Sequence, residues 1–344
     1  MEQKQLKPGK LLDDLGRLVE SGYSTSPVKI YDRNEIRANM FRIKEWDYYL
    51  IHNDSYAVAM TIADNSYMGL ISVSLMDFTT KKEITRSPMI MFPLGKMYLP
   101  SSSKKTDVQF EDDKTHIAFR HEGNVRKLTV EIDQFDISHP VSMEFELSEE
   151  PRDSMVIATP FKFWKRAFYY NQKIIGMRAS GFVKFNGETI VFAPENSYGL
   201  LDWGRGVWTY NNTWFWSAGM GQIDGHTFGF NLGYGFGKNK NATENMLFYD
   251  GIAHKLDQVT FAPNGMIDKK PDFMGPWSFT SSDGRFEAIF TPILDRKALT
   301  TLGIIQSDQH QVFGYFDGKA TLDDGQVIVL EHFLGFAEKV RNKW

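Results

Sequence analysis

HTFGFNLGYGFG, residues 226–237, alternates large apolar side chains with glycine or asparagine from Phe228 onward. Successive side chains of a β-strand point to opposite faces, so this alternation predicts a strand. On one face Asn231 is the only side chain with reach, and the others are glycines. Because glycine weakens a strand interior, the bare face indicates close approach by a bulge, another segment or a ligand; alternatively, a tightly curved barrel strand receives aromatic side chains there. The large face carries Phe228, Phe230, Leu232, Tyr234 and Phe236.

Asp224-Gly225, directly before this strand, is a turn signal that recurs along the chain. Asn-Gly and Asp-Gly suit type I′ hairpin turns, which need positive φ at both central residues. No long alternation of strands with helices is present, so we expect an all-β protein with antiparallel sheets built from hairpins. The turn dipeptides are Gly123-Asn124, Asn186-Gly187, Asp224-Gly225, Asp250-Gly251, Asp283-Gly284, Asp317-Gly318 and Asp324-Gly325.

The length of 344 residues predicts two domains, because a single hydrophobic core usually stops growing below this size. Antiparallel sheets of this extent close into barrels or pack as sandwiches, which removes their exposed edges. The charged segment EEPRDSMVIATP, Glu149–Pro160, interrupts the strand rhythm and is the predicted linker. We expect an N-terminal extension at residues 1–24, one domain at residues 25–155 and a second at residues 156–344. The extension contains one predicted amphipathic helix, Leu11–Val19.

The segment GLLDWGRGVWTYNNTWFWSAGMG, Gly199–Gly221, holds half of the eight tryptophans around one aspartate and one arginine. Its first part is too rich in glycine for regular pairing, so we expect an irregular loop that carries Asp202 and Arg205. Surrounding indoles would desolvate the carboxyl group of Asp202 and raise its pKa, which would make it a general acid. The alternative is a buried Asp–Arg pair, or an Asp that caps a turn, holding the loop shut.

At these residues the sequence resembles a known family. The motifs LLDWGRGVWTYNNTWFW, GFNLGYGFG, ATENMLFYDG, FGYFDGKA and FLGFAEKVRNKW, with RIKEWDYYLI and ADNSYMGL nearer the N-terminus, are similar to the domain of unknown function 2804. A more distant similarity links the chain to AttH-like proteins, carotenoid hydratases and tocopherol cyclases. That resemblance implies two lipocalin-like (calycin) β-barrel domains and cofactor-independent chemistry on polyenes or prenyl chains. It matches Asp202 to the acid of the hydratase motif, and Trp214 and Trp216 to its aromatic pair.

The segment DWGRG differs from the more acidic or histidine-bearing segment of the hydratases, so the resemblance does not carry over their reaction. Two functions follow for a site at or near the domain interface. One is a cofactor-independent hydratase, cyclase or isomerase that acts on a lipid or isoprenoid with Asp202 as the acid. The other is a non-catalytic carrier or sensor of a hydrophobic ligand. A structural or stress-associated protein without a small ligand is a third interpretation.

The candidate site has further members. Glu331 and His332 are neighbours in the predicted last strand QVIVLEHFLGF, so one of them is expected to face the barrel interior. Glu331 and Glu244, in ATENML, are therefore secondary candidate acids. The predicted ligand-binding residues are Trp203, Arg205, Trp208, Tyr210, Trp214, Trp216 and Asn231.

Composition excludes several classes of protein. The chain has no cysteine, and its eight histidines are scattered, so we expect no disulfide and no metal site. Its alternating glycines lie within a strand rather than before a helix, which argues against a nucleotide-binding loop, and we expect no cofactor. A net charge of −4 gives no reason to expect nucleic acid or an anionic membrane as the main partner. Without a signal peptide or an apolar membrane span, a cytoplasmic protein is expected. The sequence carries no signal for an oligomeric state.

Overall fold

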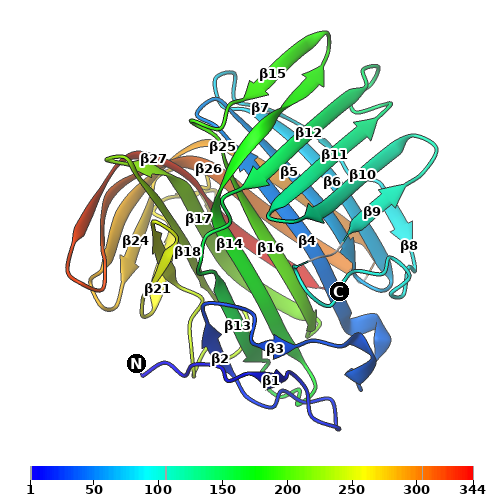
Figure 1. Ribbon diagram of the computed structural model, residues 1–344, viewed down its shortest axis with the longest axis vertical. Coiled ribbons are helices and arrows are strands. Elements are labelled where there is room, and N and C mark those ends of the chain that lie inside the picture. Colours follow the sequence, from blue (N-terminus) through cyan, green and yellow to red (C-terminus); the bar gives the residue numbers. More distant parts are fainter. Residues whose placement is uncertain (1, 105–106, 304, 344) are drawn as a thin grey trace.

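The computed structural model describes residues 2–104, 107–303 and 305–343. Two large antiparallel sheets, each curled on itself, make up most of the protein (Figure 1). The first sheet has the order β7-β6-β5-β4-β16-β14-β12-β11-β10-β9, with β13 and β15 on β14, β2 on β13 and β8 on β6. Its strands are β2 (Gly22–Ser24), β4 (Ile43–His52), β5 (Tyr56–Asp64), β6 (Met68–Asp77), β7 (Lys82–Arg86), β8 (Met89–Met91), β9 (Val108–Glu111), β10 (Thr115–Glu122), β11 (Val125–Ile132), β12 (Val141–Ser148), β13 (Met155–Pro160), β14 (Phe168–Phe185), β15 (Glu188–Phe192) and β16 (Tyr198–Val207).

The second sheet has the order β20-β19-β18-β17-β27-β26-β25-β24-β21. Its strands are β17 (Asn211–Ile223), β18 (His226–Tyr234), β19 (Met246–Tyr249), β20 (Ile252–Lys255), β21 (Val259–Pro263), β24 (Trp277–Ser281), β25 (Phe286–Leu302), β26 (Ile305–Thr321) and β27 (Val327–Lys343). The smaller elements are the parallel pair β1 (Gly9–Lys10) and β3 (Lys29–Ile30), the hairpin β22 (Met266–Ile267) and β23 (Lys270–Pro271), and the 3₁₀ turns η1 (Arg33–Glu35) and η2 (Met40–Arg42). The prediction of an all-β, lipocalin-like fold is confirmed.

The two sheets pack face to face where β14 of the first sheet contacts β17 and β18 of the second. One apolar core lies inside the curl of the second sheet and includes Phe228, Phe230 and Leu232 from the large face of β18. The other core fills the first sheet and continues into the layer between the sheets. The alternation in β18 is therefore confirmed up to Tyr234. Phe236 lies beyond the strand end and packs with the core of the first sheet instead.

The predicted helix at Leu11–Val19 is wrong. Asp13 Oδ1 accepts hydrogen bonds from the backbone N–H groups of Leu15 and Arg17, and Gly16 has φ of +72°, so the chain makes a tight turn. Leu11 is buried, whereas Leu15 is half-exposed. The apolar residues that share a helical face in the sequence therefore do not share a face in the structure.

The predicted loop that carries Asp202 and Arg205 is also wrong, because these residues lie in the middle of β16. The glycines that suggested a loop make room for aromatic rings over a regular strand. A Cβ on Gly204 would lie 1.9 Å from the Trp46 ring, and one on Gly206 would lie 2.5 Å from the Phe168 carbonyl oxygen and 3.1 Å from Trp208 Nε1. Small residues are thus required here by packing rather than by irregular backbone.

The chain passes from the first sheet to the second between β16 and β17. The predicted linker, Glu149–Pro160, does not coincide with this crossing, because its C-terminal part forms β13 of the first sheet. The domain division at residues 155/156 stays a prediction about folding units. Within residues 2–104, 107–303 and 305–343, no helix is long and apolar enough to cross a membrane.

Candidate functional site

Strand β16 divides the predicted site between its two faces. Asp202 points to the layer between the sheets, where it meets Asn171 and Lys173. Trp203 and Arg205 point into the curl of the first sheet, where the Trp203 ring meets Tyr170. The sequence placed Asp202 and Arg205 in one constellation, and the predicted Asp202–Arg205 pair is wrong because residues three apart in a strand face opposite ways.

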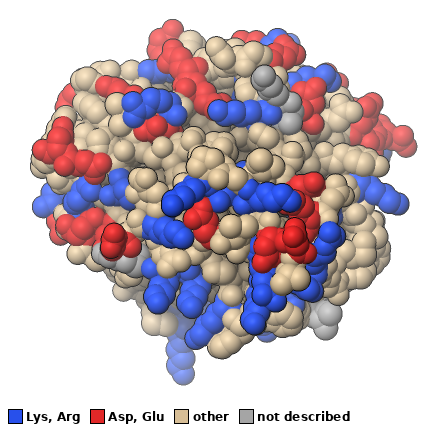
Figure 2. Space-filling view, turned by 60° about the horizontal axis from the view of Figure 1, so that its bottom comes forward, with Lys and Arg blue, Asp and Glu red and all other residues tan. Residues whose placement is uncertain are grey.

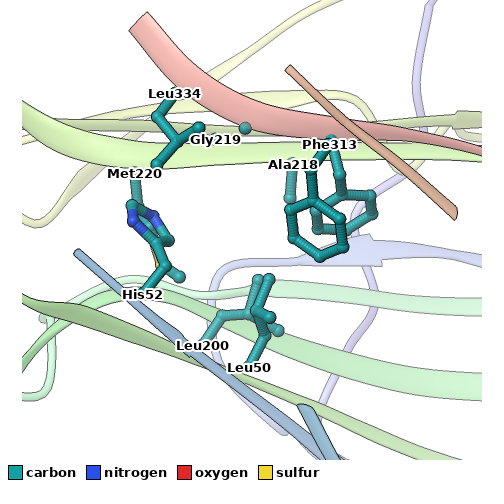
Figure 3. Close-up of a pocket in the computed structure, with 10 residues that line it drawn as sticks. Leu50, His52, Leu200, Ala218, Gly219, Met220, Phe313 and Leu334 are labelled. Carbon is teal, nitrogen blue, oxygen red and sulfur yellow. The ribbon is translucent and has the colours of Figure 1, made fainter. Parts of the chain in front are cut away.

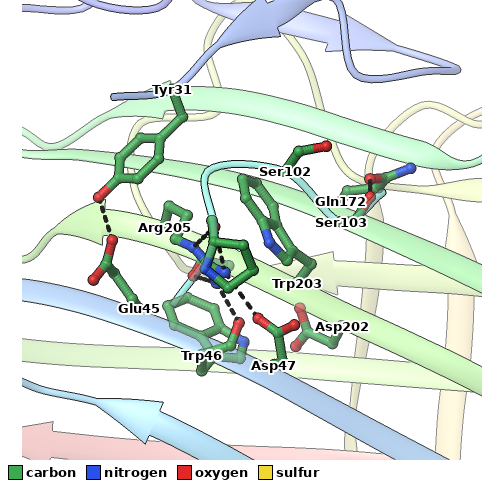
Figure 4. Close-up of polar contacts among 12 residues, drawn as sticks. Tyr31, Glu45, Trp46, Asp47, Ser102, Ser103, Gln172, Asp202, Trp203 and Arg205 are labelled. Carbon is green, nitrogen blue, oxygen red and sulfur yellow. Dashed lines mark hydrogen bonds and ion pairs between the residues drawn. The ribbon is translucent and has the colours of Figure 1, made fainter. Parts of the chain in front are cut away.

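Arg205 is fully buried and pairs with Asp47 of β4, with 2.9 Å between Nη2 and Oδ1 (Figure 4). Its remaining hydrogen bonds go to the backbone carbonyl groups of Trp46, Gly204 and Pro100. Burial raises the pKa of Asp47, and the charge of Arg205 opposes that rise. Because the N–H groups of its guanidinium all donate to acceptors within the protein, Arg205 holds β4, β16 and the segment around Pro100 together.

A buried cluster of charges lies between the sheets around Lys173 of β14. Lys173 Nζ is 3.7 Å from Asp202 Oδ1 and 3.3 Å from Glu244 Oε2, and it donates to Asn171 Oδ1 at 2.7 Å. Asn171 Nδ2 donates to Asp202 Oδ1 at 2.5 Å. The Tyr169 hydroxyl accepts from Lys173 Nζ at 3.0 Å. Asp202, Glu244 and Lys173 are thus held together by polar contacts within the layer between the sheets.

Glu338 of β27 is a third buried acid on this layer, after Asp202 and Glu244, and the sequence analysis missed it. Burial raises the pKa of Glu338 to about 7, and the charge of Asp202 adds to the rise. The Trp214 Nε1–H donor, which lies 3.1 Å from Glu338 Oε1, opposes it, as do Arg296 and Lys173. A signal existed: the alternation Leu334, Phe336, Glu338 in the last strand places this glutamate on an apolar face.

Aromatic side chains wall this polar cluster. The Trp216 ring lies 4.9 Å from Lys173 Nζ, and its Nε1–H donates to Asn231 Oδ1 at 2.8 Å. Tyr48 contacts Trp216 edge to face and shares hydrogen bonds with Gln311. The predicted residues Trp214, Trp216 and Asn231 therefore line the same buried cluster through Glu338, Lys173 and Glu244, together with residues of β4 and β26.

The bare face of β18 is covered by other segments of the chain. A Cβ on Gly233 would lie 2.5 Å from the carboxyl carbon of Glu244, and one on Gly229 would lie 2.8 Å from Ile175 Cγ2. Of the explanations offered by the sequence, close approach by another segment is the one observed. Glu244, a secondary candidate, is thereby held against the strand at the cluster.

An apolar void continues from the polar cluster between the two sheets (Figure 3). On each of five strands, a residue of the cluster and a residue that lines the void are two positions apart. Their side chains therefore point to the same face of the strand. The pairs are Tyr48 and Leu50, Asp202 and Leu200, Trp216 and Ala218, Gln311 and Phe313, and Glu338 and Phe336. The side chains that line it leave no room for a water molecule.

His52 closes the void at its other end, facing Met220 of the second sheet (Figure 3). Burial lowers the pKa of His52 to about 4, so its ring is neutral near pH 7. Within the described parts of the chain, no group lies in good hydrogen-bond geometry to either ring nitrogen. The backbone at Asn53 and Met220 interacts with the ring and partly opposes the effect of burial on its pKa.

Besides Trp203 and Arg205, the predicted residues Glu331 and Tyr210 lie away from the cluster. Glu331 is exposed, and so is His332, which has φ of +48° and donates its backbone N–H to Asp317 Oδ1. This irregularity in the β26–β27 pairing turns both side chains outward, so the expectation that one faces the interior is wrong. Tyr210 is 43% exposed, beside the chain crossing between the sheets.

Trp208 packs with Trp214 and Phe236 in an aromatic column near that crossing, with ring centroids 5.7 and 4.7 Å away. Tyr169 joins the column through Phe236, at 4.8 Å. The column therefore connects the charged cluster, through Tyr169 and Trp214, with the surface at this end of the sheets.

The comparisons with known proteins agree with this architecture. The family model described as Domain of unknown function (DUF2804) matches residues 2–344. The chain belongs to the DUF2804 family. None of the curated proteins matches the sequence.

Solved structures resemble this DUF2804 chain in fold. An AttH-type protein from Nitrosomonas europaea is 13% identical, with a TM-score of 0.53 over 93% of this chain and 98% of that chain. Kievitone hydratase from Nectria haematococca is 11% identical, with a TM-score of 0.49 over 98% of both chains. CghA with Sch210972 is 8% identical, with a TM-score of 0.44 over 99% of this chain and 97% of that chain. The first likeness shows the shared fold.

Proposed function

We propose that this DUF2804 protein binds a hydrophobic small molecule, of the lipid or isoprenoid class, between its two sheets and catalyses a proton transfer on it. The observation that carries the proposal is the position of Glu338. Its raised pKa, about 7, makes the carboxyl group a general acid near neutral pH, and it stands where the polar cluster meets the apolar void. The apolar body of the ligand would occupy the void, with a hydroxyl or carbonyl group at His52.

In this proposal Glu338 donates its proton to a carbon of a double bond. The positive charge that develops lies against the indoles of Trp214 and Trp216, and a cation on an aromatic face in a dry site is stabilised by about 2 kcal/mol. Asp202 then accepts a proton, either from a water molecule that adds to the cation or from a neighbouring carbon. The first outcome is hydration and the second is isomerisation or cyclisation; one proton is delivered and one removed in each.

This assignment gives Asp202 the acceptor role, whereas the sequence predicted it as the donor. The reason is that Glu338 is the acid whose pKa is raised, while Asn171 and Lys173 lie beside the carboxyl oxygen of Asp202. The void has no room for a water molecule, whereas a typical ligand pocket holds roughly 300 Å³ or more, so binding requires side chains or sheets to move apart.

The first test is native mass spectrometry of the gently purified protein, before and after incubation with a total lipid extract. A captured lipid, or geranylgeraniol as a defined probe, is then incubated with the protein in D₂O. We expect deuterium to enter a carbon–hydrogen bond of the ligand, with or without the mass of one added water.

Glu338→Gln should abolish this incorporation while the ligand still binds, and Asp202→Asn should slow it at least a hundredfold, the usual contribution of a general base. Glu331→Gln, a change of an exposed glutamate, is the matched control and should leave it unaltered. Binding without incorporation in the wild-type protein would instead support the non-catalytic carrier. A protein that stays bare with every lipid would overturn both functions.

A further inference from the structure

Four loops meet at the end of the molecule that is lowest in Figure 1, and we call them the rim. They are residues 37–42, 161–167, 208–213 and 235–241. Arg166 Nη1 donates to the Arg37 carbonyl at 2.9 Å, and Arg42 Nε donates to the Trp208 carbonyl at 2.7 Å. The backbone N–H of Lys238 donates to the Pro160 carbonyl at 2.8 Å. The rim is therefore one continuous surface built from segments far apart in the sequence.

The rim is basic although the protein is acidic overall. Its loops contain none of the 43 Asp and Glu residues of the chain. Figure 2 looks toward this end and shows Lys and Arg side chains spread over its lower part, with groups of Asp and Glu among the basic side chains above them. The neighbouring N-terminal turn, which Arg166 contacts through the Leu15 carbonyl, adds Asp13, Asp14 and Arg17. The basic residues of the rim are Arg37, Arg42, Lys162, Lys165, Arg166, Lys238 and Lys240, all exposed except the half-buried Arg42.

Large apolar side chains stand out among these charges. Phe163 is 88% exposed and Trp164 is 56% exposed. Lys162 Nζ lies 4.9 Å from the Phe163 ring, and the Arg42 guanidinium lies 4.8 Å from the Trp164 ring. Met40, Phe41 and Tyr210 are also exposed on this surface. Contiguous exposed apolar groups mark interaction sites, and aromatic residues beside Lys and Arg are typical of proteins that lie at a membrane surface.

The rim also stands at the outer end of the aromatic column. Phe161 of the rim contacts Phe236 at 5.0 Å, and Phe236 contacts Trp214, whose Nε1–H reaches Glu338. A continuous set of contacting aromatic rings therefore links the rim to the candidate acid.

We infer that the rim docks on the surface of a bilayer that contains anionic lipids. The basic side chains contact the headgroups, and Phe163 and Trp164 insert among the acyl chains. Delivery of a lipid substrate along the column rests on the proposed function; the docking itself does not. From the net charge of the chain we expected no anionic membrane as the main partner. Folding nevertheless brings basic residues together at the rim, and the net charge does not reveal this grouping.

Co-sedimentation of the full chain with vesicles tests the inference. We expect binding to vesicles of phosphatidylcholine mixed with phosphatidylglycerol, weak binding to phosphatidylcholine alone, and release by high salt. The variant Phe163→Ser with Trp164→Ser should bind at least tenfold more weakly. Lys162→Glu with Lys165→Glu should weaken binding further, since each basic residue near an anionic surface changes partitioning by roughly fivefold.

Matched controls lie at the opposite end of β14. Ile137, which is 99% exposed, and Lys184, whose Nζ lies 4.7 Å from the Phe182 ring, provide Ile137→Ser and Lys184→Glu, and both should bind as the wild type does. Absence of binding to anionic vesicles would overturn the inference and leave the rim as a surface for a protein partner. If the rim variants and the control variants bind equally well to the vesicles, the docking surface does not lie at the rim. Membrane docking and the proposed catalytic function can be tested separately with a substrate dispersed in detergent. A rim variant should still turn over this substrate, because the variant loses only docking.

Discussion

At the scale of single residues, Glu338 controls a measurable property of the whole fold. Its pKa is near 4.5 in the unfolded chain and about 7 in the folded protein. Between these values the folded protein holds a proton that the unfolded chain has released, so this residue makes stability fall as pH rises from about 4.5 to 7. Glu338→Gln removes that dependence, and its melting temperature should exceed that of the wild type at pH 8 by more than at pH 5.

The size of this effect follows from about 1.4 kcal/mol per pKa unit, so it amounts to a few kcal/mol at most. Thermal unfolding at a series of pH values measures it. Glu331→Gln, at an exposed position, serves as the reference and should show no such trend. A constant difference between Glu338→Gln and wild type across this range would show that Glu338 is ionised in the folded protein.

At the scale of the element, β16 performs two tasks through its two faces. The face with Asp202 belongs to the candidate site, and the face with Arg205 holds the first sheet together. Arg205→Met leaves Asp47 as an uncompensated buried charge, and we expect the free energy of unfolding to fall by about 3–5 kcal/mol in urea denaturation. The double variant Arg205→Met with Asp47→Asn should recover part of that loss, because the orphaned charge is gone.

This experiment also decides between the two interpretations of Arg205 that the sequence left open. An Arg205→Met protein of wild-type stability that no longer captures ligand would favour the predicted ligand-binding role. The five hydrogen bonds of the guanidinium group to Asp47 and to backbone carbonyls support the structural role.

At the scale of the whole molecule, the distance between the sheets depends on the glycine face of β18. A methyl group at Gly229 would lie 2.8 Å from Ile175 Cγ2 and 3.0 Å from the Gly219 carbonyl oxygen. Gly229→Ala should therefore force the sheets apart and lower the free energy of unfolding by about 1–3 kcal/mol. Gly265→Ala, whose methyl group would meet its nearest neighbour at 3.6 Å, is the control and should be tolerated. Equal stability of the two variants would show that the layer between the sheets is loosely packed.

The same layer explains why the candidate site is closed in this structure. The void between the sheets is lined by apolar side chains from both, and it lies next to a buried cluster of charges. Ligand entry must separate groups that now touch. A site at such a seam can therefore exclude water during a reaction and still open, provided that the sheets or their loops move.

The sequence by itself determined the all-β fold, because strand alternation and hairpin turns are encoded by residues close together in the chain. It also determined that β18 has a bare face and that tryptophans gather near Asp202. Only the tertiary structure decided which charged groups meet. Arg205 pairs with Asp47, 158 positions away; Glu244 reaches Lys173 across 71 positions, and Trp214 reaches Glu338 across 124. Such contacts depend on the register of strands and on how two sheets face each other, and a shift by one residue turns every side chain to the opposite face. The local pattern therefore specified the strands, and long-range pairing specified the site.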